Sequence, residues 1–426
     1  MPPCKERTGK RVPALRKMSS SISDDYASNA AQVMTKRTNQ MASRANDRAP
    51  FTDEELRDVI NSLHNITPSS ANIDWEALER LLADVAHLSH KDWHATGNNS
   101  DRMANILLPE GRGLDVHACQ MFERILLEGN WDGALEHAKS REKGNNKPWA
   151  VLVTGVNGIR KTTSIYQPWF TTVLGEALIA PPSPLGGEEY RKEFEMDALP
   201  DGSNSFFRQL DHMITTLCNE NFANLYALTA AQLGNVKKEE AEPPKELVKQ
   251  YSNLKASIFS RYRTLSELLG ALLLKEAQKL NLNTMCETSG RDIAMFQYID
   301  HFFSNCQYNK LALHFEINDL ECAMQSVDAR MAREMLTGKE ALESGDVVEV
   351  IYANAGGPYG SEVLKGVEAD SNRVWTKVMS GDGGVGTDWF KASIRINAYV
   401  DKPWTIQALR PNGTLGTEHT FEEMKS

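Results

Sequence analysis

The stretch WAVLVTGVNGIRKTT, residues 149–163, decides the predicted fold. Its apolar part, Trp149 to Val153, predicts a buried strand that ends near Gly155. The residues that follow match the phosphate-loop pattern G-x-x-x-x-G-K-[ST] at its first glycine, its lysine and its hydroxyl position. A helix-prone run comes next, TSIYQPWFTTVL, and Pro168 is expected to kink or break it. The stretch therefore predicts the strand, phosphate loop and helix of a P-loop α/β domain.

Each part of this loop has an expected task in binding a nucleoside triphosphate. The backbone N–H groups of a glycine-rich turn can point at a phosphate, and the next helix adds the positive end of its dipole. Lys161 is expected to reach the β- and γ-phosphate oxygens, and Thr162 to bind Mg²⁺ through its hydroxyl. The expected cofactors are ATP and Mg²⁺. The expected nucleotide-binding residues are Gly155, Val156, Asn157, Gly158, Ile159, Arg160, Lys161, Thr162 and Thr163.

Arg160 departs from the pattern, because it occupies the position of the usual second glycine. Its side chain either crowds the loop or places a second cation on the phosphates, where it would take part in catalysis. A structural alternative needs no ligand, since a strand, a turn and a helix with an exposed Lys161 would share the pattern. The apolar strand before the loop and the helix-prone run after it favour nucleotide binding.

A second group of candidate residues lies at the end of a later predicted strand, NTMCET (283–288). Ligands of open parallel sheets bind at the carboxyl ends of the strands, and Glu287 stands at such an end. An acid there can hold the water shell of a metal ion or activate a hydroxyl, so Glu287 is a candidate metal-binding and catalytic residue. Arg291 and Asp292 are expected to contact the substrate. The structural alternative is an ion pair between Glu287 and Arg291.

A third group lies on a helix predicted around residues 319–337. Arg330 and Arg333 are three residues apart and share a face of this helix. Arginines on a closing lid neutralise the charge of a phosphoryl group in transfer, so both are candidate catalytic residues. The alternative is a solvated helix face on which Arg330 pairs with Glu334.

The whole chain is predicted as three parts. Residues 1–50 are polar, Ser-rich and basic, which is typical of a disordered tail, with an organelle transit peptide as the functional alternative. Residues 51–145 are predicted as a helical region that begins with a capping box. Residues 146–426 are predicted as an α/β domain whose mostly parallel sheet carries helices on both faces. This domain is expected to contain a helical insertion at about 206–280 and a C-terminal β-hairpin.

The remaining elements follow from apolar periodicity. Further strands are predicted within VLGEALIAPPSP (173–184) and at 310–317, 346–354, 393–400 and 404–409. Helices are predicted at 206–232, 245–280, around 292–303 and at 361–379.

Composition and charge exclude several classes of protein. Of the 426 residues, 41% are hydrophobic and 24% charged, and no run approaches the roughly 18 apolar residues of a membrane span. The net charge of −10 divides into +6 for residues 1–50 and −16 for the remainder, which argues against a broad nucleic-acid surface. The six cysteines form no C-x-x-C pair, so neither a disulfide framework nor a structural zinc site is expected. A cytoplasmic location is expected, with organelle targeting by the basic tail as the alternative.

The phosphate loop GVNGIRKTT, the strand end ETSGRD and the arginine-bearing helix together resemble the zeta-toxin-like branch of P-loop kinases. The resemblance covers roughly residues 148–340. It implies a kinase-type parallel sheet, ATP as the phosphate donor, and a hydroxyl on a small molecule, often a nucleotide sugar, as the acceptor. It places Lys161 and Thr162 at ATP and magnesium, Arg291 at the acceptor, and one of the two helix arginines on the lid.

The catalytic base of that family is an aspartate after the second strand. The candidates for it in this chain are Asp197 and Asp201, which lie after the strand predicted within residues 173–184.

The first two motifs also resemble signal-recognition-particle-type GTPases, whose versions read GVNGxGKTT and DTAGR. The guanine-specificity motif of those proteins is absent, since FEIND (315–319) lacks the lysine. The leading hypothesis is an ATP-dependent kinase. The alternatives are an ATPase or GTPase switch, and a nucleotide-binding interaction protein whose helical N-terminal region docks a protein partner.

Three further features carry weaker expectations. His87, His90 and His94 have the spacing of one helix face, which can bind a transition metal, although an exposed histidine-rich surface is commoner. GGPYG (356–360) follows a predicted strand and is expected to form a structural turn, or else to close over the base or the substrate. Cys286 lies within a buried strand pattern and is expected in the core.

Overall fold

Strand β1 (Trp149–Thr154) is the middle one of the five parallel strands of the sheet, and all of its residues are buried. It pairs in parallel with β3 (Asn283–Glu287) on one side and with β4 (Asn309–Ile317) on the other. A strand that is covered on both faces needs apolar residues on both, and the uninterrupted run 149–153 supplies them. The three strands predicted at these positions are confirmed.

The seven-stranded sheet has the order β2-β3-β1-β4-β5-β6-β7. The computed structural model describes residues 24–422, except residues 70, 109–113, 115, 142–146, 182–198 and 235–242. The outer strands are β2 (Ser205–Arg208), β5 (Phe390–Asn397), β6 (Thr405–Leu409) and β7 (His419–Thr420). The first five strands of the order are parallel, and β6 and β7 add antiparallel to the edge. The α/β class and the C-terminal hairpin are therefore confirmed, and the hairpin makes the sheet mixed.

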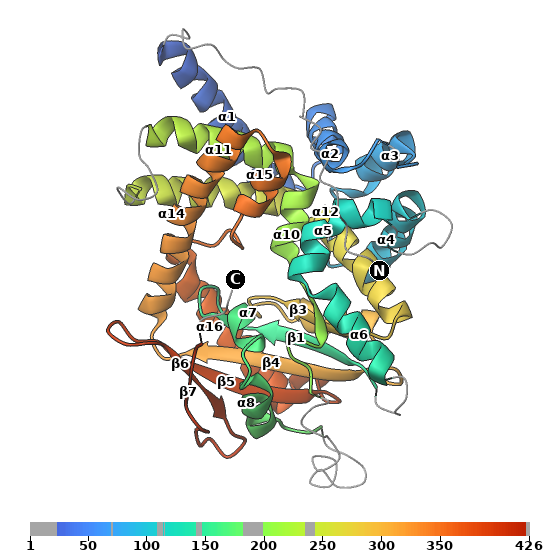
Figure 1. The fold of residues 1–426 in the computed structure, drawn as a ribbon, viewed down its shortest axis with the longest axis vertical. Helices are drawn as coiled ribbons and strands as arrows, with labels where there is room; N and C mark the ends of the chain where they lie inside the picture. Colours follow the sequence, from blue (N-terminus) through green and yellow to red (C-terminus); the bar gives the residue numbers. More distant parts are fainter. Residues whose placement is uncertain are drawn as a thin grey trace.

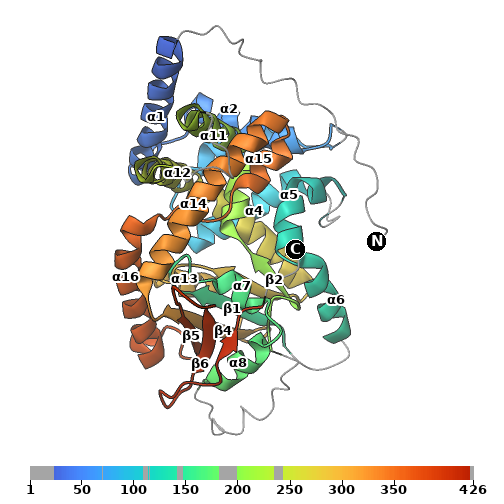
Figure 2. The same cartoon turned by 60° about the vertical axis from the view of Figure 1, so that its left-hand side comes forward.

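The helices cover both faces of the sheet and build a separate layer above its edge (Figures 1 and 2). The described α-helices are α1 (Asp24–Asn46), α2 (Asp53–Ile66), α3 (Trp75–Val85), α4 (Trp93–Leu107), α5 (Val116–Glu128), α6 (Trp131–Arg141), α7 (Lys161–Ile165), α8 (Phe170–Ala177), α10 (Leu210–Leu217), α11 (Asn219–Leu233), α12 (Lys245–Lys279), α13 (Ala294–Phe302), α14 (Leu320–Ser344), α15 (Val347–Ala353) and α16 (Ser361–Ser380). A short 3₁₀ helix, η3 (Asp382–Gly384), precedes β5.

Alternate side chains of the strands face two different apolar cores. Val151 and Val153 of β1 pack on one face with Phe170 and Val173 of α8. On the opposite face, Leu152 packs in a core that α13, α16 and the C-terminal half of α12 complete. This alternation follows from the period of two in a strand.

The third core belongs to the helical layer, and it draws on distant parts of the chain. Val59 of α2, Phe122 of α5, Leu265 of α12 and Met335 of α14 are all buried in it. The helices before β1 and the helices after β2 therefore share one core, and the N-terminal helical region is not packed as an independent unit. The boundary predicted at 145–146 falls at a segment outside the described residues.

Two predicted strands are wrong. The segment predicted as a strand at 346–354 contains helix α15 (Val347–Ala353), and its N-cap residue Asp346 accepts a hydrogen bond from the Val348 N–H at 2.8 Å. The β-branched run favours a strand, but a packed helix with a proper cap is the outcome. Within residues 173–184, α8 continues to Ala177, and only Ile179 makes an isolated antiparallel bridge, to Lys391. Residues 182–198 are outside the described part.

The predicted helical insertion is wrong at its beginning, because residues 205–208 form strand β2. This strand is only four residues long and fully buried, so it has no alternating pattern that sequence periodicity could detect. The predicted helices then follow as α10, α11 and α12, and Pro168 separates α7 from α8 as expected.

The predicted disordered tail is wrong for residues 24–46, which form helix α1, whereas residues 1–23 lie outside the described part. Met41 is buried against the helical layer, and Arg37 pairs with Asp58 of α2 at 2.6 Å. These tertiary contacts stabilise a helix that its own polar composition does not predict. The capping box of α2 is confirmed: the Thr52 hydroxyl accepts from the Glu55 N–H at 3.2 Å and the Glu55 carboxylate accepts from the Thr52 N–H at 2.8 Å. Among the described residues, no helix is long and apolar enough to cross a membrane.

Candidate active site

The loop between β1 and α7 has the backbone conformation that its glycines allow. Gly155 and Gly158 have φ values of 127° and 83°, which side-chain-bearing residues rarely adopt. A β-carbon at Gly155 would lie 2.4 Å from the Phe315 carbonyl oxygen, and one at Gly158 would lie 2.8 Å from the Ala323 carbonyl oxygen. Among the described residues, no backbone carbonyl accepts a hydrogen bond from the amides of residues 156–160. The loop thus turns tightly and keeps its amides available for a ligand.

Lys161, Thr162 and Glu287 form one contact cluster where β1 and β3 end. The register pairs Val153 with Glu287, so the carboxylate lies beside the start of the loop. Lys161 Nζ is 3.0 Å from Glu287 Oε1, and it also donates to the Val156 carbonyl oxygen at 2.7 Å. Thr162 Oγ1 donates to Glu287 Oε2 at 3.2 Å. Lys161 is buried, and so the interpretation of a merely exposed lysine is wrong.

Arg160 points away from this cluster. Its backbone has φ 63° and ψ 28°, the left-handed conformation that a glycine would adopt without strain. Its guanidinium lies 4.6 Å from the Trp404 ring centroid, beside β6, and 5.3 Å from that of Phe421. The side chain therefore contacts the C-terminal strands and does not lie beside Lys161.

Asp211, the acid that follows β2, is a site residue that no local sequence pattern predicted. Strand β2 is parallel to β3, and Arg208 pairs in register with Cys286, so Asp211 lies at the same sheet edge as Glu287. A β-carbon at Gly357 would lie 3.4 Å from Asp211 Oδ2 and 3.0 Å from Asn157 Nδ2, so the carboxylate and the side-chain amide of Asn157, in the loop after β1, are close together. The apolar pair Phe206-Phe207 is the sequence signal for β2, and a strand assigned there would have placed Asp211 just after a strand end.

The pKa of Asp211 is raised above its ordinary value, and the largest cause is burial. The negative charge of Glu287 raises it further, while the positive charges of Lys255, Arg330 and Arg263 act in the opposite direction. A carboxylate whose pKa is shifted by burial and by nearby charges in a cavity is a candidate for a functional group.

The earlier candidates for the base do not share this position. Asp201 precedes β2, at the opposite edge of the sheet, and its carboxylate accepts from the Ser203 N–H at 2.8 Å and from the Asn204 N–H at 3.0 Å. It therefore stabilises a turn. Asp197 lies outside the described residues.

Arg291 and Asp292 both line the cavity beside this cluster. Arg291 donates to the Tyr359 hydroxyl at 3.1 Å, so the alternative of a Glu287–Arg291 ion pair is wrong. Asp292 forms an ion pair with Lys91, in the connection between α3 and α4, and accepts from the Ala294 N–H at 3.0 Å. The pKa of Asp292 is held below its ordinary value: burial raises it, but the bonds from Lys91 and Ala294 outweigh that effect.

The two helix arginines differ in their surroundings. Arg330 is partly buried and donates to the Gly357 carbonyl oxygen at 3.0 Å, whereas Arg333 is exposed. Glu334 does not pair with Arg330, so that alternative is wrong; it is buried and accepts from Lys255. Arg330 is therefore the arginine that the fold brings to the site.

The segment GGPYG (356–360) follows helix α15, not a strand, and it lies over the site. Gly356 has φ 141°, and a β-carbon there would lie 2.8 Å from Arg330 Nη1. Gly357 and Tyr359 line the same cavity as Asp211 and Glu287. The segment therefore lines the candidate site, and its closing over a base or a substrate stays a prediction.

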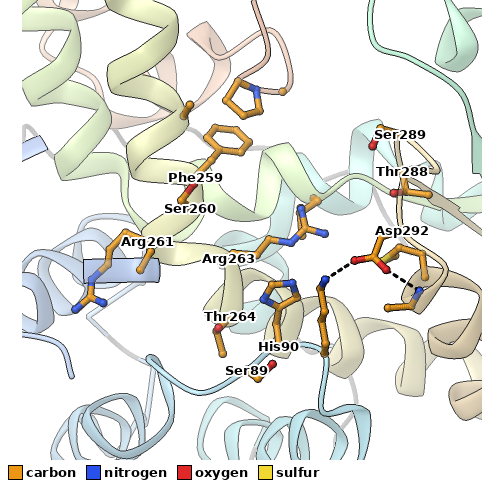
Figure 3. Close-up of a pocket in the computed structure, with 18 of the residues that line it drawn as sticks. Ser89, His90, Phe259, Ser260, Arg261, Arg263, Thr264, Thr288, Ser289 and Asp292 are labelled. Carbon is orange, nitrogen blue, oxygen red and sulfur yellow. Dashed lines mark hydrogen bonds and ion pairs between the residues drawn. The ribbon is translucent and has the colours of Figure 1, made fainter. Parts of the chain in front are cut away.

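A cavity of about 530 Å³ lies between the carboxyl ends of the parallel strands and the helical layer. Asn157, Asp211, Glu287 and Arg291 line one part of it, and the α3–α4 connection and α12 line the other. Figure 3 shows Arg263 and His90 on one side, with Asp292 and its ion pair facing them. The volume is typical of a site for a small molecule.

The histidine group does not form one helix face. Helix α3 ends at Val85 and α4 begins at Trp93, so His87 and His90 lie in the connection and only His94 is helical. His94 packs edge-on against His301, with 4.5 Å between ring centroids. Within the part of the chain that the structure describes, no three His, Cys, Asp or Glu side chains are grouped so that they could hold a metal ion.

Cys286 is buried in the core as expected. Burial raises the pKa of its thiol to about 11.

The chain matches no protein-family model, no curated protein and no solved structure.

Proposed function

We propose that the protein is an ATP-dependent kinase that transfers the γ-phosphoryl group to a hydroxyl of a small molecule, such as a nucleotide or a nucleotide sugar. One observation carries the proposal: the buried Lys161, the Thr162 hydroxyl and the Glu287 carboxylate meet where β1 and β3 end, and a second acid, Asp211, lines the same cavity as Glu287. The resemblance to zeta-toxin-like P-loop kinases supports it, because that family also places an aspartate after its second strand.

The phosphate loop is the proposed ATP site. Its tight turn and available amides suit the phosphate oxygens, and Lys161 would exchange Val156 and Glu287 for the β- and γ-phosphates. Thr162 and Glu287 offer the hard oxygen ligands that Mg²⁺ prefers. When bound there, Mg²⁺ neutralises charge on the phosphates.

Asp211 is the proposed general base. The acceptor oxygen attacks the γ-phosphorus, its proton passes to Asp211, and the bond between the γ-phosphorus and the bridging oxygen of ADP breaks. Arg330, near Asp211, supplies positive charge for the transferred group. Arg291 and the part of the cavity formed by α12 and the α3–α4 connection would hold the acceptor.

The first test is nucleotide binding. Lys161→Ala should weaken the binding of ATP with Mg²⁺ about 10- to 100-fold, because it removes charge-assisted hydrogen bonds to the phosphates. Titration calorimetry measures this. Lys377→Ala, an exposed lysine on α16, is the control and should bind like the wild type. Equal affinity of the Lys161 variant would remove the proposed site.

The second test separates a kinase from a nucleotide switch. The purified protein is incubated with γ-labelled ATP, with and without the low-molecular-weight fraction of a cell extract. A kinase forms ADP faster with the fraction and transfers the label to a small molecule. Hydrolysis at one rate in both mixtures would favour the ATPase or GTPase alternative, and binding without turnover would favour an interaction protein.

A further inference from the structure

A fully buried ion pair lies behind the candidate site. Lys255 of α12 and Glu334 of α14 both have side chains that are 0% exposed. Lys255 Nζ is 2.7 Å from Glu334 Oε1 and 2.8 Å from Oε2, and it donates a third bond to Asn354 Oδ1 at 2.7 Å. All three ammonium protons therefore have a described acceptor.

The network continues from this pair to the loop that covers the site. Glu334 Oε2 accepts from the Ala355 N–H at 2.9 Å, and Glu334 Oε1 accepts from the Tyr251 hydroxyl. Asn354 Oδ1 accepts from the Gly356 N–H at 3.3 Å. The Ala355 amide is thus held by Glu334 of α14, and the Gly356 amide by Asn354, the C-cap residue of α15.

The same network reaches the proposed base. Asn354 Nδ2 donates to the backbone carbonyl oxygen of Asp211 at 3.2 Å. Asn354 is itself fully buried: its side-chain oxygen accepts a hydrogen bond from Lys255, and its side-chain nitrogen donates one to Asp211. One asparagine therefore joins the ion pair, the covering loop and the residue that carries the carboxylate.

Stability alone is a weak reason for such an arrangement. Removing two charges from water costs several kcal/mol per ion, and apolar residues of similar size often pack at least as stably. The helical layer around the pair is apolar, with Leu254, Ile258 and Met335 buried nearby in the chain. Apolar side chains at these positions could not make the hydrogen bonds to Asp211, Ala355 and Gly356.

We propose that Lys255, Glu334 and Asn354 form a positioning network that fixes Asp211 and the Ala355–Gly356 backbone opposite the phosphate loop. The network touches neither the phosphate loop nor the proposed metal ligands in any described contact, so it acts on the geometry of transfer and not on nucleotide binding. The expected effect on phosphoryl transfer rests on the proposed function, whereas the expected effect on the backbone around Asp211 and Gly356 rests on the contacts alone.

The structural consequence is tested by amide hydrogen exchange of the full chain. Asn354→Ala leaves the ion pair in place and cuts its links to Asp211 and Gly356. Exchange should become faster in peptides covering residues 209–213 and 354–360. Lys310→Met is the control: Lys310 is also a buried lysine paired with a carboxylate, Asp300 at 2.6 Å, but it lies at the opposite end of the sheet. Unchanged exchange in the two peptides of the Asn354 variant would overturn the network, whatever the protein does.

The catalytic consequence is tested by separating affinity from turnover. Lys255→Met and Asn354→Ala should bind ATP with Mg²⁺ like the wild type, while the rate of label transfer falls roughly 10- to 100-fold, as expected for a misplaced base. Lys310→Met should lose stability without this loss of rate. A normal rate in Asn354→Ala would overturn the positioning role. If the wild type transfers no label, the proposed function fails, and the exchange experiment still decides the network.

Discussion

Asp211 is the residue on which the chemistry of the proposed transfer depends. Its carboxylate receives opposing influences, since burial and Glu287 favour the neutral form and three cations favour the charged form. The position three residues after a short buried strand is enough to bring it to the phosphate loop. Its role is open to a direct test.

Asp211→Asn should keep the affinity for ATP with Mg²⁺ and lower phosphoryl transfer about 10²- to 10⁴-fold, the usual contribution of a general base. The raised pKa adds a pH prediction. The carboxylate is ionised only above its pKa, so the wild-type rate should fall on acidification at a pH above 3.8, the ordinary value of an aspartate. Rate measurements between pH 4 and pH 8 check both; an unimpaired variant contradicts the assignment.

Arg160 illustrates two effects of similar size that oppose each other. The left-handed backbone of a non-glycine residue costs about 1–2 kcal/mol, and a guanidinium over an aromatic ring returns about 0.5–2 kcal/mol. Arg160→Gly should therefore change the free energy of unfolding little, and ATP affinity should stay constant because the side chain faces Trp404. A double-mutant cycle with Trp404→Leu should give a coupling free energy of about 0.5–1 kcal/mol. No coupling, or a marked loss of ATP binding in Arg160→Gly, would place the arginine elsewhere in solution.

At the scale of elements, the phosphate loop depends on the close approach of α14. Gly158 and Gly413 have almost the same φ, 83° and 80°, but only Gly158 is crowded, with the Ala323 carbonyl oxygen 2.8 Å from an added β-carbon. A comparison of substitutions at Gly158 and Gly413 therefore separates the effect of packing from the effect of backbone strain.

Gly413→Ala should lower the free energy of unfolding only by the backbone strain, about 1–2 kcal/mol. Gly158→Ala should lower it by about 1–3 kcal/mol more, because the added methyl group overpacks the contact with α14. Gly158→Ala should also weaken ATP binding. Urea unfolding and calorimetric titration measure the two effects. Equal destabilisation by both variants would mean that α14 yields to the added methyl group.

The elements that sequence predicted correctly have a local cause. The run at 149–153 is apolar without interruption, and Thr52 with Glu55 forms a complete capping box, so both appear in the structure. The elements that were missed depend on distant contacts. Strand β2 is too short for any periodicity, and α15 is a run of β-branched residues that a cap and tertiary packing make helical.

The same distinction applies to the site. Lys161, Thr162 and Glu287 were predicted because a motif and a strand end place them, whereas Asp211 needed the strand order. The position of Arg160 needed the C-terminal hairpin, which no local pattern relates to residue 160. The Lys255–Glu334 pair joins two helices far apart in the sequence and has no local signal.

At the scale of the whole molecule, a buried histidine beneath the site links stability to pH. His314 of β4 has its Nδ1 2.9 Å from Thr154 Oγ1, and burial lowers its pKa to about 3 from an ordinary 6.5. The unfolded chain therefore binds a proton below pH 6.5 that the folded chain refuses until about pH 3. The folded state should lose stability as the pH falls through this window.

Urea unfolding of the wild type at pH 7 and pH 5 should show this loss, and His314→Asn should show a smaller one. His419, which is only partly buried and has a ring stacked on Trp169, provides the matched control in His419→Asn. A loss of the same size in all three proteins would assign the acid sensitivity to other groups.

The shared core of the helical layer has a consequence for how the chain is made. Its residues extend from Met41 to Ala353, and strands β1 to β4 lie between them in the sequence. During synthesis on the ribosome, α2 to α5 emerge long before α14 and α15 exist to cover them. The apolar faces of these early helices stay uncovered until α14 and α15 have been synthesised. The nascent chain should therefore require a holding chaperone until translation has passed residue 353.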